Sequence, residues 1–176
     1  MQLSPQYRRT LMKRASFEDM QCSIAQTLEV VGEWWTLLVL REVFFGRRRF
    51  GEMLEDLGIA RNILTDRLNK LVDEGILVRH DVTGTGGRYE YRLTEQGLEL
   101  FPVLVALMQW GDRWRKLPKG APTEIVHRTC NRKTTPALVC SHCREPLSAS
   151  NVAARPGRGF RRDLDHPLVR ASSASS

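Results

Sequence analysis

The sequence has no long apolar run. Residues 34–40 form a mostly apolar stretch, but it is well short of the roughly 18–20 residues that a helix needs to cross a bilayer. Residues 1–14 are polar and basic, and no apolar segment of a secretory signal follows them. We therefore expect no membrane partner and a location in the cytoplasm.

The sequence also lacks the motifs of common enzyme classes. It has no nucleotide-binding glycine loop before a helix, no nucleophile elbow and no triad of metal ligands with an open position. The glycine-rich run at residues 84–87 leads into a predicted strand, so it does not form a phosphate cradle at a helix start. We therefore predict that the protein is not an enzyme.

Cysteine is scarce, with four in 176 residues. In the expected cytoplasmic setting thiols stay reduced, so a disulfide framework is not predicted. The remaining interpretations are metal ligands, redox sensors and buried apolar side chains.

Positive charge is abundant, with a formal net charge of +7. Such a charge suits nucleic acid, an anionic membrane or an acidic partner, and charge alone does not choose among them. Composition divides the chain into four parts. We expect a basic arm at 1–15, a folded domain at 16–117, a small Cys/His segment at 118–150 and a disordered tail at 151–176.

The order of predicted elements in the folded domain indicates a winged helix-turn-helix, a mainly α fold with a small β-hairpin. Helical periodicity predicts a first helix around Ile24, Leu28 and Val31, and a buried helix over 33–45. A short helix at 51–57, a connector at 58–60 and a helix at 61–74 follow. Two alternating stretches, 76–82 and 88–93, predict a hairpin. The last helix is predicted over 95–117, with Thr94 as its N-cap.

The helix at 61–74 is predicted to read DNA. If its leucines face the core, polar side chains remain outside. These are Arg61, Asn62, Thr65, Asp66, Arg67, Asn69 and Lys70. Arginine pairs well with guanine and asparagine with adenine, because each forms two hydrogen bonds to that base edge. Asp66 would be repelled by phosphate, so we expect it to orient Arg67 or Lys70, or to accept from cytosine. Arg88 follows the glycine-rich hairpin tip and is predicted to contact the DNA backbone or minor groove.

These motifs together resemble the HxlR family of bacterial regulators. The similar segments are Cys22-Ser23-Ile24, Gly32-Glu33-Trp34-Trp35, Arg49-Phe50-Gly51-Glu52-Met53-Leu54, Leu64-Thr65-Asp66-Arg67-Leu68, Gly75-Ile76-Leu77-Val78-Arg79, Tyr89-Glu90-Tyr91-Arg92-Leu93-Thr94, Leu100-Phe101-Pro102-Val103-Leu104 and Trp110-Gly111. The resemblance implies a fold related to the MarR group. It also implies a homodimer built from the first and last helices, which binds a partly palindromic operator in double-stranded DNA. Ser23 and Ala60 depart from the proline and the helix-capping serine that are usual in the family.

The predicted function is transcription regulation, with repression by occlusion of the operator as the simplest mode. A protein-interaction module is the alternative, and salt-dependent binding to duplex DNA would separate the two. Cys22 begins the first predicted helix, where a thiolate is stabilised. Because some similar regulators sense oxidants through the matching cysteine, a redox-responsive regulator is a further alternative, and simple packing of Cys22 is another. A small-molecule effector also fits the resemblance.

A second cluster lies in the Cys/His segment. His127 and Cys130 form one chelating pair, and Cys140 and Cys143 form another, which together are the ligands of a tetrahedral zinc site. His142 could replace His127. Such a zinc would be structural and would stabilise a segment with little apolar content. The nine-residue spacing is short, and Asn131 and Arg144 stand where zinc turns usually have glycine. Both features argue against zinc.

Overall fold

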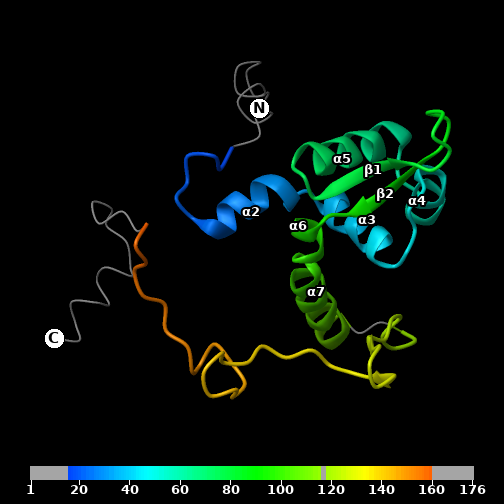
Figure 1. The fold of residues 1–176 in the computed structure, drawn as a ribbon. Helices are drawn as coiled ribbons and strands as arrows, with labels where there is room; N and C mark the ends of the chain where they lie inside the picture. Colours follow the sequence, from blue (N-terminus) through cyan, green and yellow to red (C-terminus); the bar gives the residue numbers. More distant parts are fainter. Residues whose placement is uncertain (1–15, 116–117, 160–176) are drawn as a thin grey trace, which may run out of the picture. The chain divides into compact units, whose positions relative to one another are not determined.

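A computed structural model describes residues 16–115 and 118–159 (Figure 1). The predicted basic arm and the end of the predicted tail lie outside these ranges. The chain forms two compact units, Met1–Glu99 and Leu100–Ser176. In the described ranges, no helix has the length and apolarity of a membrane span.

The first unit has the predicted order of elements (Figure 1). Its helices and strands are α2 (Ser23–Val31), α3 (Trp34–Phe44), α4 (Phe50–Leu57), α5 (Arg61–Asp73), β1 (Leu77–Asp81), β2 (Tyr89–Leu93) and α6 (Glu95–Leu98). The winged helix-turn-helix prediction is therefore confirmed, with element ends within two residues of those expected before α6.

The core of this unit is formed mainly by α3 and α5. The side chains of Val39 and Leu40 in α3 have no exposed surface, and neither do Leu64, Leu68 and Leu71 in α5. The spacing i, i+4, i+7 puts the three leucines on one helical face, as the sequence predicted. Each such buried side chain contributes about 1.5–3 kcal/mol.

The turn between α4 and α5 needs a residue with positive φ. Gly58 has φ 59°, and its amide donates to the carbonyl of Leu54 at 3.1 Å. Glycine adopts this left-handed conformation without a steric penalty, so the chain can reverse after α4. Ile59 is then buried, which fixes the direction in which α5 leaves the turn.

Strands β1 and β2 form the antiparallel hairpin. The register pairs Leu77 with Leu93 and Asp81 with Tyr89. The amide of Tyr91 also donates to the carbonyl of Arg48 at 2.8 Å. The segment before α4 is therefore attached to β2.

Two expectations about the helices need correction. The predicted helix at 95–117 is divided into α6 and α7 (Phe101–Trp114). Pro102 has no amide hydrogen to continue the α6 ladder, and it stands in the first turn of the new helix, which begins at Phe101. Helix α3 is not buried all round, because the side chain of Trp34 at its first residue is 79% exposed.

The second unit contains α7, β3 (Val126–His127) and β4 (Arg132–Lys133). The side-chain amide of Gln109 in α7 donates to the carbonyl of Pro136 at 2.8 Å. The division of the chain thus falls after Glu99, whereas the sequence suggested a boundary at residue 117. Helix α7 belongs with the segment that follows it because the two are directly bonded.

The start of α6 packs closely on the backbone between α5 and β1. Thr94 is the predicted N-cap, which is confirmed, since its Oγ1 accepts from the amide of Gly97 at 3.1 Å. A Cβ at Gly97 would lie 2.3 Å from the carbonyl oxygen of Ile76 and 3.0 Å from Cδ2 of Leu93. This position therefore has no room for a side chain.

We expect Gly97→Ala to lower the free energy of unfolding by about 1–3 kcal/mol, because the backbone at Ile76 must shift. Urea denaturation followed by circular dichroism measures the change. Gly51→Ala is the matched control, since a Cβ there has nothing within 4 Å and alanine favours the helix. Equal stability of the Gly97 variant and the wild type would contradict the close packing.

Candidate nucleic-acid interface

The outer face of α5 carries most of the predicted DNA-binding residues. Its exposed members are Arg61, Asn62, Thr65, Asp66 and Asn69. They are exposed because the leucines between them are buried in the core. The helix thus presents one continuous polar face that begins at its N-terminus.

Arg61 has a defined position at the start of this face. Its guanidinium carbon lies 5.2 Å from the centre of the Phe50 ring, a cation–π contact. Thr65 Oγ1 donates to the carbonyl of Arg61 at 2.9 Å, so this hydroxyl is partly occupied within the helix. Phe50 restricts the arginine side chain while leaving it exposed.

Arg67 and Lys70 lie differently from the other predicted residues. Arg67 is half-buried, and its Nη1 is 3.9 Å from Oε2 of Glu33. Lys70 Nζ donates to the backbone carbonyl of Glu29 at 2.5 Å. The sequence predicts that Asp66 orients Arg67 or Lys70, or that it accepts from cytosine. In the structure these two cations contact Glu33 and the backbone of Glu29 instead, and the contact of Asp66 with cytosine stays a prediction.

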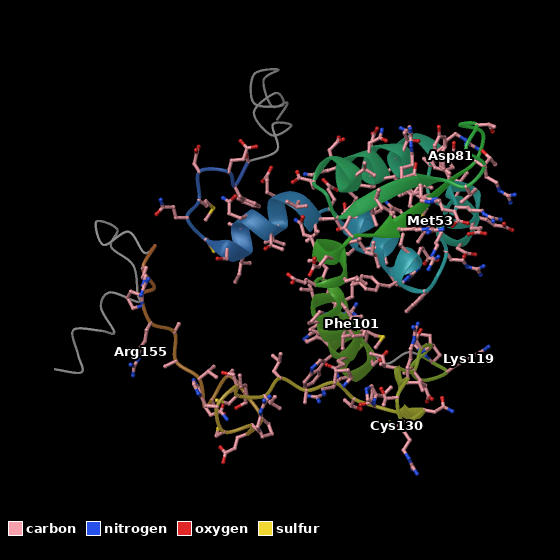
Figure 2. All side chains as sticks on the ribbon, in the orientation of Figure 1. Met53, Asp81, Phe101, Lys119, Cys130 and Arg155 are labelled. Carbon is pink, nitrogen blue, oxygen red and sulfur yellow. The ribbon has the colours of Figure 1, made fainter. Side chains whose placement is uncertain are left out.

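The loop of the hairpin is ordered by Asp81, which lies at the end of β1 (Figure 2). Its Oδ1 accepts from the amide and the hydroxyl of Thr83, both at 2.9 Å, and its Oδ2 accepts from the amide of Gly86 at 2.6 Å. The hydrogen bonds from the Thr83 and Gly86 amides lower the pKa of Asp81. Arg88 is exposed at the far end of this ordered loop.

Sequence reasoning did not select Asp81 or Arg79. The signal for Asp81 was available, because aspartate two residues before a threonine or serine often forms such a turn. Arg79 is exposed, and its guanidinium carbon lies 4.3 Å from the centre of the Tyr89 ring. This contact depends on the register of the hairpin and could not be assigned from one strand.

A second charged cluster lies on β2, close to the loop of the hairpin. Glu90 accepts from Arg92 at 3.2 Å and from Arg49 at 3.4 Å. The hydrogen bond from Arg92, with the charges of both arginines, lowers the pKa of Glu90. The carboxylate connects β2 to the segment before α4, and it does so near the loop, since Glu90 pairs with His80 and the next pair is Asp81 with Tyr89.

Comparison with known proteins agrees with this geometry. The model of the HxlR-like helix-turn-helix family matches residues 30–119 of the 176-residue chain. The chain belongs to this family. The family comprises transcriptional regulators with a helix-turn-helix, so the protein is a transcriptional regulator of that kind.

Relatives of this HxlR-like protein carry the same description. The uncharacterized HTH-type transcriptional regulator Rv3095 of Mycobacterium tuberculosis is 48% identical over 142 residues, which cover 81% of this chain and 90% of that one. The regulator sll1512 of Synechocystis is 39% identical over 94 residues, covering 53% of this chain and 70% of the relative.

Solved structures support the fold assignment. PA1607, assigned as a transcription factor, superposes with a TM-score of 0.72 and is 34% identical. That match covers 81% of this chain and all of PA1607, so it extends well beyond the helix-turn-helix. The redox regulator HypR in its oxidized form gives a TM-score of 0.50 at 30% identity, covering 55% of this chain and all of HypR.

Of the four cysteines of this HxlR-like chain, Cys22 lies in the first unit and the other three lie in the second. Cys22 is exposed and occupies the N-cap position of α2, where its side chain makes no capping hydrogen bond. His127 Nδ1 lies 3.4 Å from Cys130 Sγ. Cys140 Sγ accepts from the amides of Cys143 and His142, which lowers the pKa of the Cys140 thiol. Within 16–115 and 118–159, no three His, Cys, Asp or Glu side chains lie together as a metal site.

Asp81→Ala should release the hairpin loop. The Thr83 and Gly86 amides are expected to exchange faster with solvent, since their acceptor is removed, while the core is unaffected. Hydrogen exchange measured by NMR reports both, with exposed Asp73→Ala as the control. Because the pKa of Asp81 is lowered, the wild-type bonds should persist as pH falls below the usual value of 3.8 and be lost through the lower native pKa. Unchanged exchange in the variant would contradict this role.

Proposed function

We propose that this HxlR-like regulator is a repressor that binds a partly palindromic operator as a homodimer. The observation that carries the proposal is the exposed N-terminal face of α5, with Arg61 held against Phe50 and the ordered hairpin as a second contact. A single helix of this length covers few base pairs, and a two-fold dimer presents two such helices to adjacent half-sites.

In this proposal α5 lies in the major groove. Arg61 and Asn62 stand at its N-terminal end, which is the part of a recognition helix that contacts base edges. Arginine reads guanine and asparagine reads adenine through paired hydrogen bonds. Asn69, two turns further on, and the cations Arg79 and Arg88 of the hairpin would contact phosphate or the minor groove.

Half-buried Arg67 and Lys70 are assigned a supporting role here. Their contacts with Glu33 and with the carbonyl of Glu29 connect α5 to the end of α2 and the start of α3. Phosphate contacts by these two residues remain a prediction, since each would have to exchange a present contact for the DNA backbone.

The proposed dimer uses α2 and α7. Soluble monomers rarely expose many large apolar side chains on one element, yet both helices do. In and next to α2 these are Met20, Ile24 and Leu28, and in α7 they include Val103, Leu107, Trp110 and Trp114. The Ile24 side chain is 72% exposed, although the sequence pattern put it on the apolar face of a helix. Association of two chains through these helices would cover that face.

Redox control through Cys22 is a second candidate function. Two observations favour it: the Cys22 thiol is exposed at the start of α2, and HypR, a structural relative, is a redox regulator. Since α2 belongs to the proposed dimer contact, oxidation of this thiol would act on the geometry of the dimer. A small-molecule effector remains a prediction from the family resemblance.

Binding to the DNA upstream of the protein's own gene tests the main proposal. We expect Arg61→Ala/Asn62→Ala to raise Kd at least about tenfold, because each paired base contact contributes about 1–3 kcal/mol. Fluorescence anisotropy at two salt concentrations gives Kd and the salt dependence that phosphate contacts produce.

The matched control is Arg155→Ala/Asn151→Ala, which removes the same two residue types from exposed positions outside α5. This variant should bind like the wild type. Equal losses in both variants, or binding that is indifferent to sequence, would refute the assignment of α5.

Repeating the titration with a mild oxidant, on the wild type and on Cys22→Ser, tests redox control. An oxidant effect that persists in Cys22→Ser would exclude that thiol as the sensor.

Ile24→Glu should shift the protein from dimer to monomer. A charge in the proposed contact is costly to bury, whereas the exposed side chain has little role in folding one chain. Sedimentation equilibrium should give twice the 20.2 kDa chain mass for the wild type and a lower mass for the variant. Val78→Glu, at an exposed valine of the hairpin, should remain dimeric. A monomeric wild type, or a fully dimeric Ile24→Glu, would refute the dimer through α2.

A further inference from the structure

Two short turns in the second unit have the same backbone geometry. In the first, the chain reverses after His127 and Cys130, and the amide of Asn131 donates to the carbonyl of His127 at 2.8 Å. In the second, it reverses after Cys140 and Cys143, and the amide of Arg144 donates to the carbonyl of Cys140 at 3.0 Å. We call residues 127–131 and 140–144 the ligand turns.

Each ligand turn lies at the tip of a small hairpin. The first joins β3 to β4, where His127 pairs with Arg132 (Figure 2 labels Cys130 in this turn). The second is flanked by the bridge between Val139 and Pro146, and the amide of Cys140 donates to the carbonyl of Glu145 at 2.9 Å. In the first turn His127 ends β3, in the second Cys140 directly follows the bridge at Val139, and in both the second ligand residue comes three positions later.

The backbone is strained at the same place in both turns. Asn131 has φ 52° and Arg144 has φ 63°, and they are the two non-glycine residues with positive φ among 16–115 and 118–159. Each comes directly after the second ligand residue of its turn. Such conformations persist only where the surroundings impose them, and they concentrate at functional sites. The missing glycines, which argued against zinc in the sequence, are replaced by residues that adopt the required conformation.

The two side chains of the first turn already approach as ligands of one ion would. His127 Nδ1 and Cys130 Sγ are 3.4 Å apart. Bond lengths of about 2.05 Å to nitrogen and 2.3 Å to sulfur, at a tetrahedral angle, put two such ligand atoms about 3.6 Å apart. In the other turn, Cys140 Sγ accepts from the amides of His142 and Cys143 and interacts with the Cys143 thiol. Amide hydrogen bonds of this kind support a metal-bound thiolate.

Apart from a bound metal, little in the described part of residues 118–159 could stabilise its fold. No residue in the described part of 118–159 is buried, and its strands β3 and β4 have two residues each. A segment of this kind has too little apolar contact to offset the entropy of ordering it. A metal ion shared by the two turns would supply that stability.

We propose that the two ligand turns together bind one structural zinc ion. The four ligands are His127, Cys130, Cys140 and Cys143. Three thiolates and one imidazole leave no open position for water, so the ion has no catalytic role. Arg128, Arg132 and Arg144 adjoin the ligands and offset the net negative charge of a zinc ion with three thiolates.

Zinc has to bring the two ligand turns together. The nine residues 131–139 between Cys130 and Cys140 reach up to about 30 Å when extended and are long enough to fold back so that the turns face each other. Binding therefore couples to folding of the second unit, independently of the DNA-binding face of α5.

Metal analysis of the full chain tests the proposal. Protein produced with added zinc sulfate and dialysed against metal-free buffer should contain about one zinc per chain by plasma mass spectrometry. Cys140→Ser should retain less than about a tenth of that amount. Replacement by Co²⁺ should give the intense visible bands of a tetrahedral site and a thiolate charge-transfer band, which identify the ligand type.

Two histidine variants test the ligand assignment. His127→Ala should weaken Co²⁺ binding at least about tenfold, and the matched control His142→Ala should leave it unchanged. The thermal midpoint of the first unit and DNA binding of each variant show that the chain remains folded.

A wild type without metal, or a Cys140→Ser variant that keeps its zinc, would overturn the site. A ratio of one zinc per two chains would overturn the single-chain arrangement, and a loss confined to His142→Ala would overturn the choice of histidine. None of these results bears on the operator experiment, so the two proposals fail separately.

Discussion

The DNA-binding face of this protein depends on the packing of α5 against α3. Leu64, Leu68 and Leu71 are fully buried, and Val39 and Leu40 of α3 are buried with them. Because these leucines occupy one side of the helix, the polar residues between them must face outward. The same apolar contact therefore both stabilises the unit and determines which side chains of α5 are available to DNA.

Carboxylates organise the surroundings of that helix. Asp81 closes the hairpin loop by accepting from backbone amides, and Glu90 on β2 pairs with Arg49 and Arg92. Glu33, the residue before α3, forms an ion pair with Arg67 of α5. In a chain with net charge +7, these acidic side chains hold specific cations in place and leave others, such as Arg61 and Arg88, exposed. The exposed arginines at the start of α5 and after the hairpin loop therefore remain available to bind an anionic partner.

The two units of the chain are stabilised in different ways. The first contains nearly all of the buried apolar side chains, whereas the described residues after α7 contain none. The strained turns at Asn131 and Arg144 have no apolar core to impose them. A segment of this kind requires stabilisation other than an apolar core, which the proposed zinc would supply.

The sequence by itself determined the order of elements, the inward face of α5 and the Thr94 cap, because periodicity and capping are local properties of the chain. It also predicted the exposed residues at the start of α5, whose exposure the structure shows. Only the tertiary structure decided that Arg67 and Lys70 turn toward Glu33 and Glu29, and that Arg79 lies over Tyr89, because these contacts join residues distant in sequence. The backbone of Asn131 and Arg144 was equally beyond the sequence, since neither residue type requires positive φ and only the closed turns impose it.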